Sequence, residues 1–206
     1  MRRILRISLS IIDIVRRPYR FQLLGRRSYQ VEDVMQNFLE LAKARFSVRN
    51  FAATPIADDK LNLILEAGRV APTAKNYQPQ KVYVLRSEEA IAKIRSVCPC
   101  AYNAPVVLAV CYDENLNWKN DLTPGYQSGE ADASIVCTHM MLEAWDLGIG
   151  SVWVGWFNHA QVHEVLELPK NIKVAALLPI GYLPEGAAPS GNHASIRPAT
   201  ETIEYR

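Results

Sequence analysis

The longest apolar pattern in the chain runs from Asp132 to Phe157. Up to Leu147, apolar residues occupy nearly every side of a helical wheel, which is typical of a central, buried helix. We expect Gly148 and Gly150 to end this helix, because glycine readily adopts the left-handed geometry of helix C-termini. Residues 151–154 are β-prone and predict a core strand. The stretch is too short and too often interrupted by charged residues to span a bilayer.

The rest of the chain alternates helical and strand patterns. Asp58 and Ser87 are predicted to cap the helices that follow them, and Asn158 is predicted to start a later one. In the helix predicted at Val31–Arg45, the side chains of Val34, Met35, Phe38, Leu39 and Ala42 are expected to face inward. Helices are predicted at Val31–Arg45, from Asp58 to about Val70, from Ser87 to Val97 and after Asn158, and strands at Lys81–Leu85, Val106–Cys111, Val174–Ile180 and Thr202–Tyr205. The polar loop Asp113–Gln127, which contains Trp118, is long enough to act as a lid.

Residues 2–17 form a separate pattern, a basic amphipathic helix that ends at Pro18. Six large aliphatic residues share one arc, and arginines dominate the other. We expect the aliphatic face to pack on the body or on a partner subunit. Weak contact with an anionic membrane surface and an organellar transit peptide are the alternatives. Residues 1–30 are therefore assigned to a basic N-terminal extension, and residues 31–206 to one folded domain.

Charge and cysteine content narrow the functional classes. The 206 residues are 49% hydrophobic and 21% charged, as in a soluble globular protein. Residues 1–30 hold eight arginines and one acid, whereas the remainder holds 15 basic and 20 acidic residues, a net charge of −5. The body therefore gives no reason to expect nucleic acid as a partner. The four cysteines do not form a disulfide framework, which favours a reducing, cytoplasmic location.

Metal binding is not expected. Cys98-Pro-Cys100 has one intervening residue, not the two of redox or zinc motifs, so structural cysteines are favoured over a redox or metal pair. His159 and His163 are four residues apart, but no zinc motif surrounds them.

Three short segments carry candidate chemistry. Arg45-Phe-Ser-Val-Arg49 combines two guanidinium groups and a hydroxyl, which can bind a phosphate or can simply form a solvated basic edge. The loop at residues 71–79 presents hydroxyl and amide groups, which serve a ligand or a turn equally well. Gly155, between large apolar residues, lets the backbone approach something flat.

Together these segments carry a resemblance. Arg45-Phe-Ser-Val-Arg49, Ala71-Pro-Thr-Ala-Lys-Asn-Tyr-Gln-Pro79, Gly148-Ile-Gly-Ser-Val-Trp-Val-Gly155 and Arg197-Pro198 resemble the nitroreductase family in order and spacing, over roughly residues 31–206. The resemblance implies an α+β fold, a three-layer sandwich whose central mixed or antiparallel sheet is flanked by helices. It also implies an intertwined homodimer with two FMN sites at its interface.

The same resemblance implies roles for individual residues. Arg45, Ser47 and Arg197 would hold the FMN phosphate, and Phe46 between them is also assigned to the cofactor site. Arg49 would reach the pyrimidine edge, the loop residues Pro72, Thr73, Ala74 and Asn76 would come from the other subunit, and Val154 and Gly155 would lie against the flavin N5. The family often has a second basic residue before the tail proline. Here Ile196 precedes Arg197, and His193 is the candidate replacement. Gln80 follows Pro79 where the family often has tryptophan.

The implied activity passes a hydride from NADH or NADPH through FMN to a small organic acceptor, such as a nitroaromatic or a quinone, in a ping-pong cycle. The flavin carries the chemistry, so no catalytic side chain is assigned. Two alternatives stay open. One is different flavin chemistry on this scaffold, namely dehalogenation, enone reduction or flavin fragmentation. The other is a flavin-binding or membrane-docked module with little turnover, favoured only by the arginine-rich extension.

Overall fold

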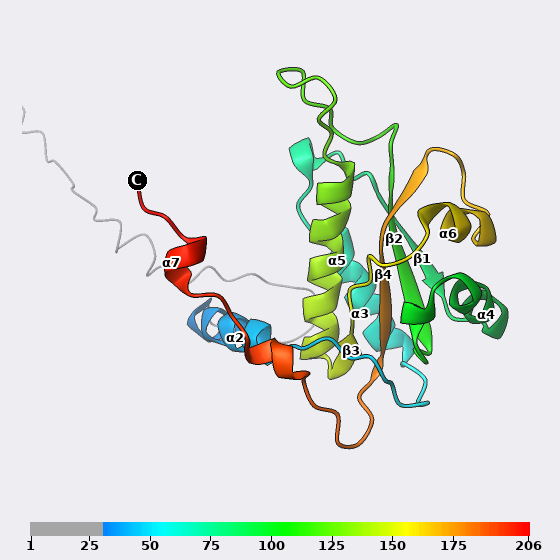
Figure 1. The fold of residues 1–206 in the computed structure, drawn as a ribbon, viewed down its shortest axis with the longest axis vertical. Coiled ribbons are helices and arrows are strands. Elements are labelled where there is room, and N and C mark those ends of the chain that lie inside the picture. The colour runs from blue at the N-terminus through cyan, green and yellow to red at the C-terminus, as the bar shows by residue number, and fades with distance from the viewer. Residues whose placement is uncertain (1–30) are drawn as a thin grey trace, which may run out of the picture. The chain divides into compact units, whose positions relative to one another are not determined.

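The computed structural model describes residues 31–206, with side chains from Phe38 onward (Figure 1). The predicted amphipathic helix at residues 2–17 lies outside the described residues and stays a prediction. The predicted domain boundary at residue 30 lies at their edge and also stays a prediction. The chain divides after Ala44 into two compact units. Helix α2 (Val31–Ala44) is therefore described by itself. Its Phe38 and Leu39 are more than half exposed, so the prediction that both face inward is wrong for the single chain.

The second unit is built on a four-stranded antiparallel sheet in the order β1-β2-β4-β3. The two central strands, β2 and β4, are the long apolar runs of the sequence, and they pair along their length with one irregularity at Val110 and Cys111. The strands are β1 (Gln80–Leu85), β2 (Val106–Asp113), β3 (Ile149–Ser151) and β4 (Ile172–Tyr182). The expected α+β fold is therefore present, with an antiparallel sheet.

Helices cover both faces of this sheet (Figure 1). Successive side chains of a strand point to opposite faces, so β2 contributes Val106, Leu108 and Val110 to one core and Val107, Ala109 and Cys111 to the other. This division explains why β2 is apolar without alternation. The helices are α3 (Asp58–Arg69) and α5 (Gly129–Asp146) on the first face, and α4 (Glu88–Val97) and α6 (His159–Val165) on the second.

Helix α5 is the 18-residue helix that the long apolar pattern predicted. Gly148 has a positive φ of 74°, as a C-terminal stop requires. Gly150 does not end the helix, contrary to expectation. It lies in β3, where a Cβ would stand 2.7 Å from Cγ2 of Val48, so the close approach of the Val48 side chain favours glycine here.

Local signals explain most helix starts. The Ser87 hydroxyl accepts from the Ala90 N–H, and Asn158 accepts from two N–H groups, so both predicted caps are confirmed. Asp58 is the first residue of α3 and Ala57 is the N-cap, so the Asp58 cap was wrong. The Asp58 carboxylate instead pairs with Arg86 at 2.8 Å.

The C-terminal segment differs from expectation. The predicted strand Thr202–Tyr205 is wrong, because a short helix, α7 (Ala199–Thr202), occupies its start and no strand pairs with the remainder. Short 3-10 turns η1 (Ala74–Asn76), η2 (Pro99–Ala101) and η3 (Gly191–Ala194) complete the described chain. No helix within residues 31–206 is long and apolar enough to cross a membrane.

Candidate functional site

The basic segment Arg45–Arg49 adds an edge to the β3 end of the sheet. The Val48 N–H donates to the Ser151 carbonyl at 2.9 Å, and Ser47 forms a parallel bridge with Ser151. Phe46 and Val48 are buried, and the Phe46 ring packs edge-on against Trp145 of α5 at 5.0 Å. Because side chains alternate along extended backbone, Arg45, Ser47 and Arg49 are left on the accessible side.

A groove of ≈ 370 Å³ lies between this segment and the chain that follows β4. Its walls are residues 46–50 on one side and residues from Pro184 to Ser190 on the other. The turn η3 brings the His193 ring to 6.2 Å from the Phe46 ring. The residue expected to replace the missing second basic residue therefore lies beside the Arg45–Arg49 segment.

The arginines differ in their partners. Among the side chains that the structure describes, from Phe38 onward, no carboxylate lies within ion-pair distance of Arg45 or Arg49, and the Arg49 guanidinium makes a long 3.4 Å bond to the Ser47 carbonyl. Arg197 instead pairs with Glu201 of α7 at 3.1 Å, and it does not line the groove. The structure therefore does not bring all three predicted phosphate ligands together.

The backbone at Val154 is fixed by hydrogen bonds, and the neighbouring Gly155 is exposed. Val154 is buried and exchanges two hydrogen bonds with Leu177 of β4, at 2.9 and 3.0 Å. Gly155 is exposed, and a Cβ on it would meet nothing within 4 Å. A rigid strip of backbone is thus presented at the surface.

The loop Pro72–Asn76 lies at the other end of α5 (Figure 1). The buried Asp132 accepts from the Ala74 N–H at 2.9 Å and from the Ser128 hydroxyl at 2.7 Å. Lys75, Asn76 and Gln78 all have positive φ, of 50°, 56° and 51°. Such geometry costs about 1–3 kcal/mol at each non-glycine residue and persists where neighbouring contacts impose it.

Two segments of the predicted site are therefore separated within one chain. Asp132 holds the loop, Trp145 holds the Arg45–Arg49 segment, and the two residues are 13 positions apart on α5. At 1.5 Å per residue, this separation is about 20 Å along the helix axis. The loop and the Arg45–Arg49 segment of one chain are therefore anchored at opposite ends of α5.

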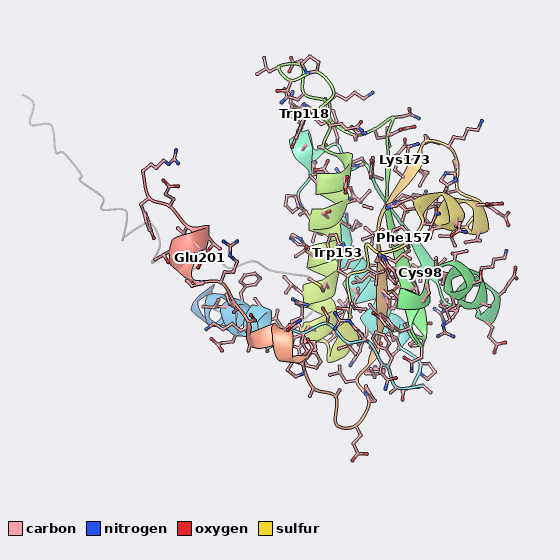
Figure 2. The ribbon with its side chains drawn as sticks, in the orientation of Figure 1. Cys98, Trp118, Trp153, Phe157, Lys173 and Glu201 are labelled. Atoms are coloured by element: carbon pink, nitrogen blue, oxygen red, sulfur yellow. The ribbon has the colours of Figure 1, made fainter. Side chains whose placement is uncertain are left out.

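The loop Asp113–Gln127 brings Trp118 to the Pro72–Asn76 loop, and two further residues, Asp132 and Tyr102, were not indicated by the sequence. Trp118 lies near the N-terminal end of α5, where the Lys75 ammonium lies 5.9 Å from its ring centre (Figure 2). The Asp132 anchor was missed because its partner is 58 positions away. Tyr102, with a φ of 52°, was missed because no sequence pattern marks strained backbone. Within residues 31–206, no cluster of three or more His, Cys, Asp or Glu could hold a metal ion.

Three layers around an antiparallel sheet, with a groove at the β3 end beside the Arg45–Arg49 segment, define an α+β protein. The chain belongs to the nitroreductase family, whose model matches residues 42–100 and 96–182. The crystal structure of a nitroreductase family protein from Clostridium difficile is similar, with 36% identity, a TM-score of 0.76, and coverage of 82% of this chain and 98% of that one.

Two relatives by sequence extend the comparison. A protein of Archaeoglobus fulgidus, named for NADH dehydrogenase or NAD(P)H nitroreductase activity, is 30% identical over 72% of this chain and 86% of its own. An FMN reductase [NAD(P)H] of Bacillus subtilis is 31% identical over 66% of this chain and 61% of its own.

Proposed function

We propose that this member of the nitroreductase family is an FMN-dependent oxidoreductase that takes electrons from NADH or NADPH and passes them to a small organic acceptor. The observation that carries the proposal is the pair of arginines without carboxylate partners beside a groove, close to exposed backbone at the sheet edge. The relatives named for nitroreductase and FMN reductase activity support the same chemistry.

The groove fits the phosphate end of FMN. Arg45 and the Ser47 hydroxyl lie on the accessible side of their segment, so they can donate to phosphate oxygens without first breaking an ion pair. Arg197 would have to leave Glu201, but an exposed ion pair contributes only about 0–1 kcal/mol. Phosphate can therefore recruit Arg197 at little cost.

The opposite end of the cofactor would meet Arg49 and Gly155. The Arg49 guanidinium would donate to the oxygen-bearing pyrimidine edge, where its charge favours added electron density. The exposed Gly155 backbone would lie against N5, because no side chain prevents the approach. Bound FMN supplies hydride transfer, and these residues supply binding, orientation and charge.

We infer that the working unit is a homodimer. Pro72–Asn76 and Arg45–Arg49 are held at opposite ends of α5, so a site that uses both must take them from different chains. The outward side of α5 is compatible with this arrangement, because the apolar side chain of Ile135 is 38% exposed there. Light scattering of the flavin-bound protein should give twice the chain mass, and a flavin-loaded monomer would refute the inference.

The proposal is tested with purified protein and its Arg45→Ala variant. Wild type should retain FMN and, without oxygen, lose flavin absorbance on addition of NADH or NADPH. Arg45→Ala should bind FMN about 10–100-fold more weakly, because a hydrogen bond to a charged group is worth about 1.5–3 kcal/mol. Retention of the full yellow stoichiometry by Arg45→Ala would show that the phosphate lies elsewhere. A wild-type flavin that no nicotinamide reduces would favour the low-turnover alternative.

A further inference from the structure

The loop Pro72–Asn76 holds Lys75 in a backbone conformation that a side chain disfavours. Lys75 has φ 50° and ψ 20°, in the left-handed region that glycine adopts without strain. Hydrogen bonds on both sides impose this conformation, because the Ala74 N–H donates to Asp132 at 2.9 Å and the Tyr77 N–H donates to the Ala74 carbonyl at 3.1 Å. Strained residues gather at binding sites, so a lysine where glycine would fit indicates a use for its side chain.

The Lys75 side chain lies beside two aromatic rings of the loop Asp113–Gln127. Its ammonium is 5.9 Å from the centre of the Trp118 ring, within the range of a cation–π contact. The Tyr126 ring packs edge-on against the same indole, with the ring centres 6.2 Å apart. Trp118 is half-buried, whereas Lys75 is exposed and Tyr126 is 51% exposed. Lys75, Trp118 and Tyr126 therefore form an aromatic corner, which two loops build at the surface.

Asp132 fixes the two loops of the aromatic corner relative to each other. The Ser128 hydroxyl donates to one oxygen of its carboxylate at 2.7 Å, and the Ser128 N–H donates to the Trp118 carbonyl at 2.9 Å. The other carboxylate oxygen accepts from the Ala74 N–H, next to Lys75. Both Asp132 and Ser128 are buried. The ammonium and the indole are therefore held together by buried hydrogen bonds as well as by their own attraction.

The Lys75 ammonium is available to an anionic ligand. Among the side chains from Phe38 onward, no carboxylate lies within ion-pair distance of this ammonium. A cation–π contact at an exposed site is weaker than a charge-assisted hydrogen bond, so a carboxylate can take the N–H groups of Lys75 at little cost. A flat ring that bears this carboxylate can pack on the exposed parts of Trp118 and Tyr126.

We propose that Lys75, Trp118 and Tyr126 select the electron acceptor, and that they favour flat aromatic acceptors that carry a carboxylate or a sulfonate. The proposal rests on the proposed function, because the loop Pro72–Asn76 meets the flavin only in the homodimer inferred above. It goes further by naming the class of acceptor and by giving the loop Asp113–Gln127 a role. It also explains why a lysine keeps a conformation that suits glycine.

The test compares 4-nitrobenzoate with its neutral methyl ester as acceptors for the FMN-bound enzyme. Each turnover consumes one NADH or NADPH and one proton, converts the nitro group to a nitroso group and releases water. The measured quantity is kcat/KM of a variant relative to wild type, so the different reactivities of the two acceptors cancel. Lys75→Met keeps the chain length but removes the charge. It should lower kcat/KM about tenfold for 4-nitrobenzoate and less than about twofold for the ester. Equal losses for the two acceptors would overturn the proposal.

Lys170→Met is the matched control, because Lys170 is an exposed lysine beyond α6 and its loss changes the net charge equally. It should change kcat/KM for either acceptor by less than about twofold. Lys75→Arg, which keeps the charge, should retain most of the activity with 4-nitrobenzoate. In a Trp118→Leu background the ammonium is no longer held, so the effect of Lys75→Met on 4-nitrobenzoate should shrink to about threefold or less. An undiminished effect there would overturn the role of Trp118.

The reductant NADPH also carries an anionic group, its 2′-phosphate, and so offers a second source of negative charge. If Lys75 serves the acceptor, Lys75→Met should change KM for NADPH and for NADH to the same extent. A selective rise in KM for NADPH, with kcat/KM for 4-nitrobenzoate unchanged, would assign the charge to the reductant and overturn the proposal.

A binding readout does not need turnover. Benzoate, which the enzyme cannot reduce as a nitroaromatic, should shift the indole N–H signal of Trp118 in an NMR spectrum, assigned by its loss in Trp118→Phe. The shift should be absent in Lys75→Met. If benzoate leaves the Trp118 signal of wild type in place, the aromatic corner does not bind aromatic anions and the proposal is overturned. If benzoate shifts this signal but the protein binds no FMN, the proposed function and the acceptor role fail, whereas the ligand chemistry of the corner stands.

Discussion

Asp132→Ala is the substitution that most directly tests how the fold builds the site. Asp132 is 3% exposed, and its two oxygens accept from the Ala74 N–H and the Ser128 hydroxyl. Alanine removes both bonds and leaves two donors without a partner. Two hydrogen bonds to a carboxylate are together worth about 3 kcal/mol.

Part of this lost stability is recovered because the backbone of the loop can relax. With the anchor gone, Lys75 can leave its left-handed conformation, which restores about 1 kcal/mol. The net cost is then about 2 kcal/mol, a fall in melting temperature of about 4–8 °C for a domain of this size. Because the freed loop no longer holds its shape, FMN affinity should fall together with thermal stability.

Differential scanning calorimetry and FMN titration of the same preparations measure both effects. The control is Asp132→Asn, whose amide oxygen still accepts from Ala74 and whose NH₂ donates to a rotated Ser128 hydroxyl. It should lose about 1 kcal/mol, or about 2–4 °C. If Asp132→Ala melts within 1 °C of wild type, the carboxylate does not hold the loop and the reasoning fails.

Three further predictions concern two glycines and the thiols. Gly150→Ala should cost about 1–3 kcal/mol, seen in chemical denaturation, because its Cβ would overlap a buried valine. Gly155→Ala should leave stability unchanged, since its Cβ meets nothing in the chain, yet it should weaken FMN binding in a titration. Burial raises the pKa of the Cys111 and Cys137 thiols to about 12. Iodoacetamide at pH 8 should therefore label the half-exposed Cys100 first in native protein, as read by peptide mass spectrometry, and early labelling of either buried thiol would contradict the packing.

The sequence predicted what depends on short-range chemistry. Ser87 and Asn158 were identified as caps because a cap needs only its own side chain and the next two or three N–H groups. The same rule failed at Asp58, where a carboxylate near a helix start pairs with Arg86 of another segment instead. A residue type that is common at helix caps can form its bond with another partner instead.

Rules based on short-range chemistry do not predict contacts between residues that are far apart in the sequence. Nothing in β2 or β4 indicates that the two strands are neighbours, because each is apolar along its whole length and pairs equally well with any similar strand. The Asp132 anchor and the hydrogen bond between Asn103 and Phe51 likewise join positions 58 and 52 residues apart. The resemblance to a known family identified the candidate segments, and only the fold gave their separation along α5.

That separation also explains the pattern of α5. A helix that only covers one face of a sheet needs a single apolar stripe and can be polar elsewhere. Helix α5 packs on the sheet and α3 through residues such as Val136 and Met140, yet it keeps apolar Ile135 on its exposed side. An apolar side chain at this position becomes buried where a second copy covers it. If the second copy also brings its Pro72–Asn76 loop to the first chain's arginines, one helix provides both the interface and the spacing between the two parts of the site.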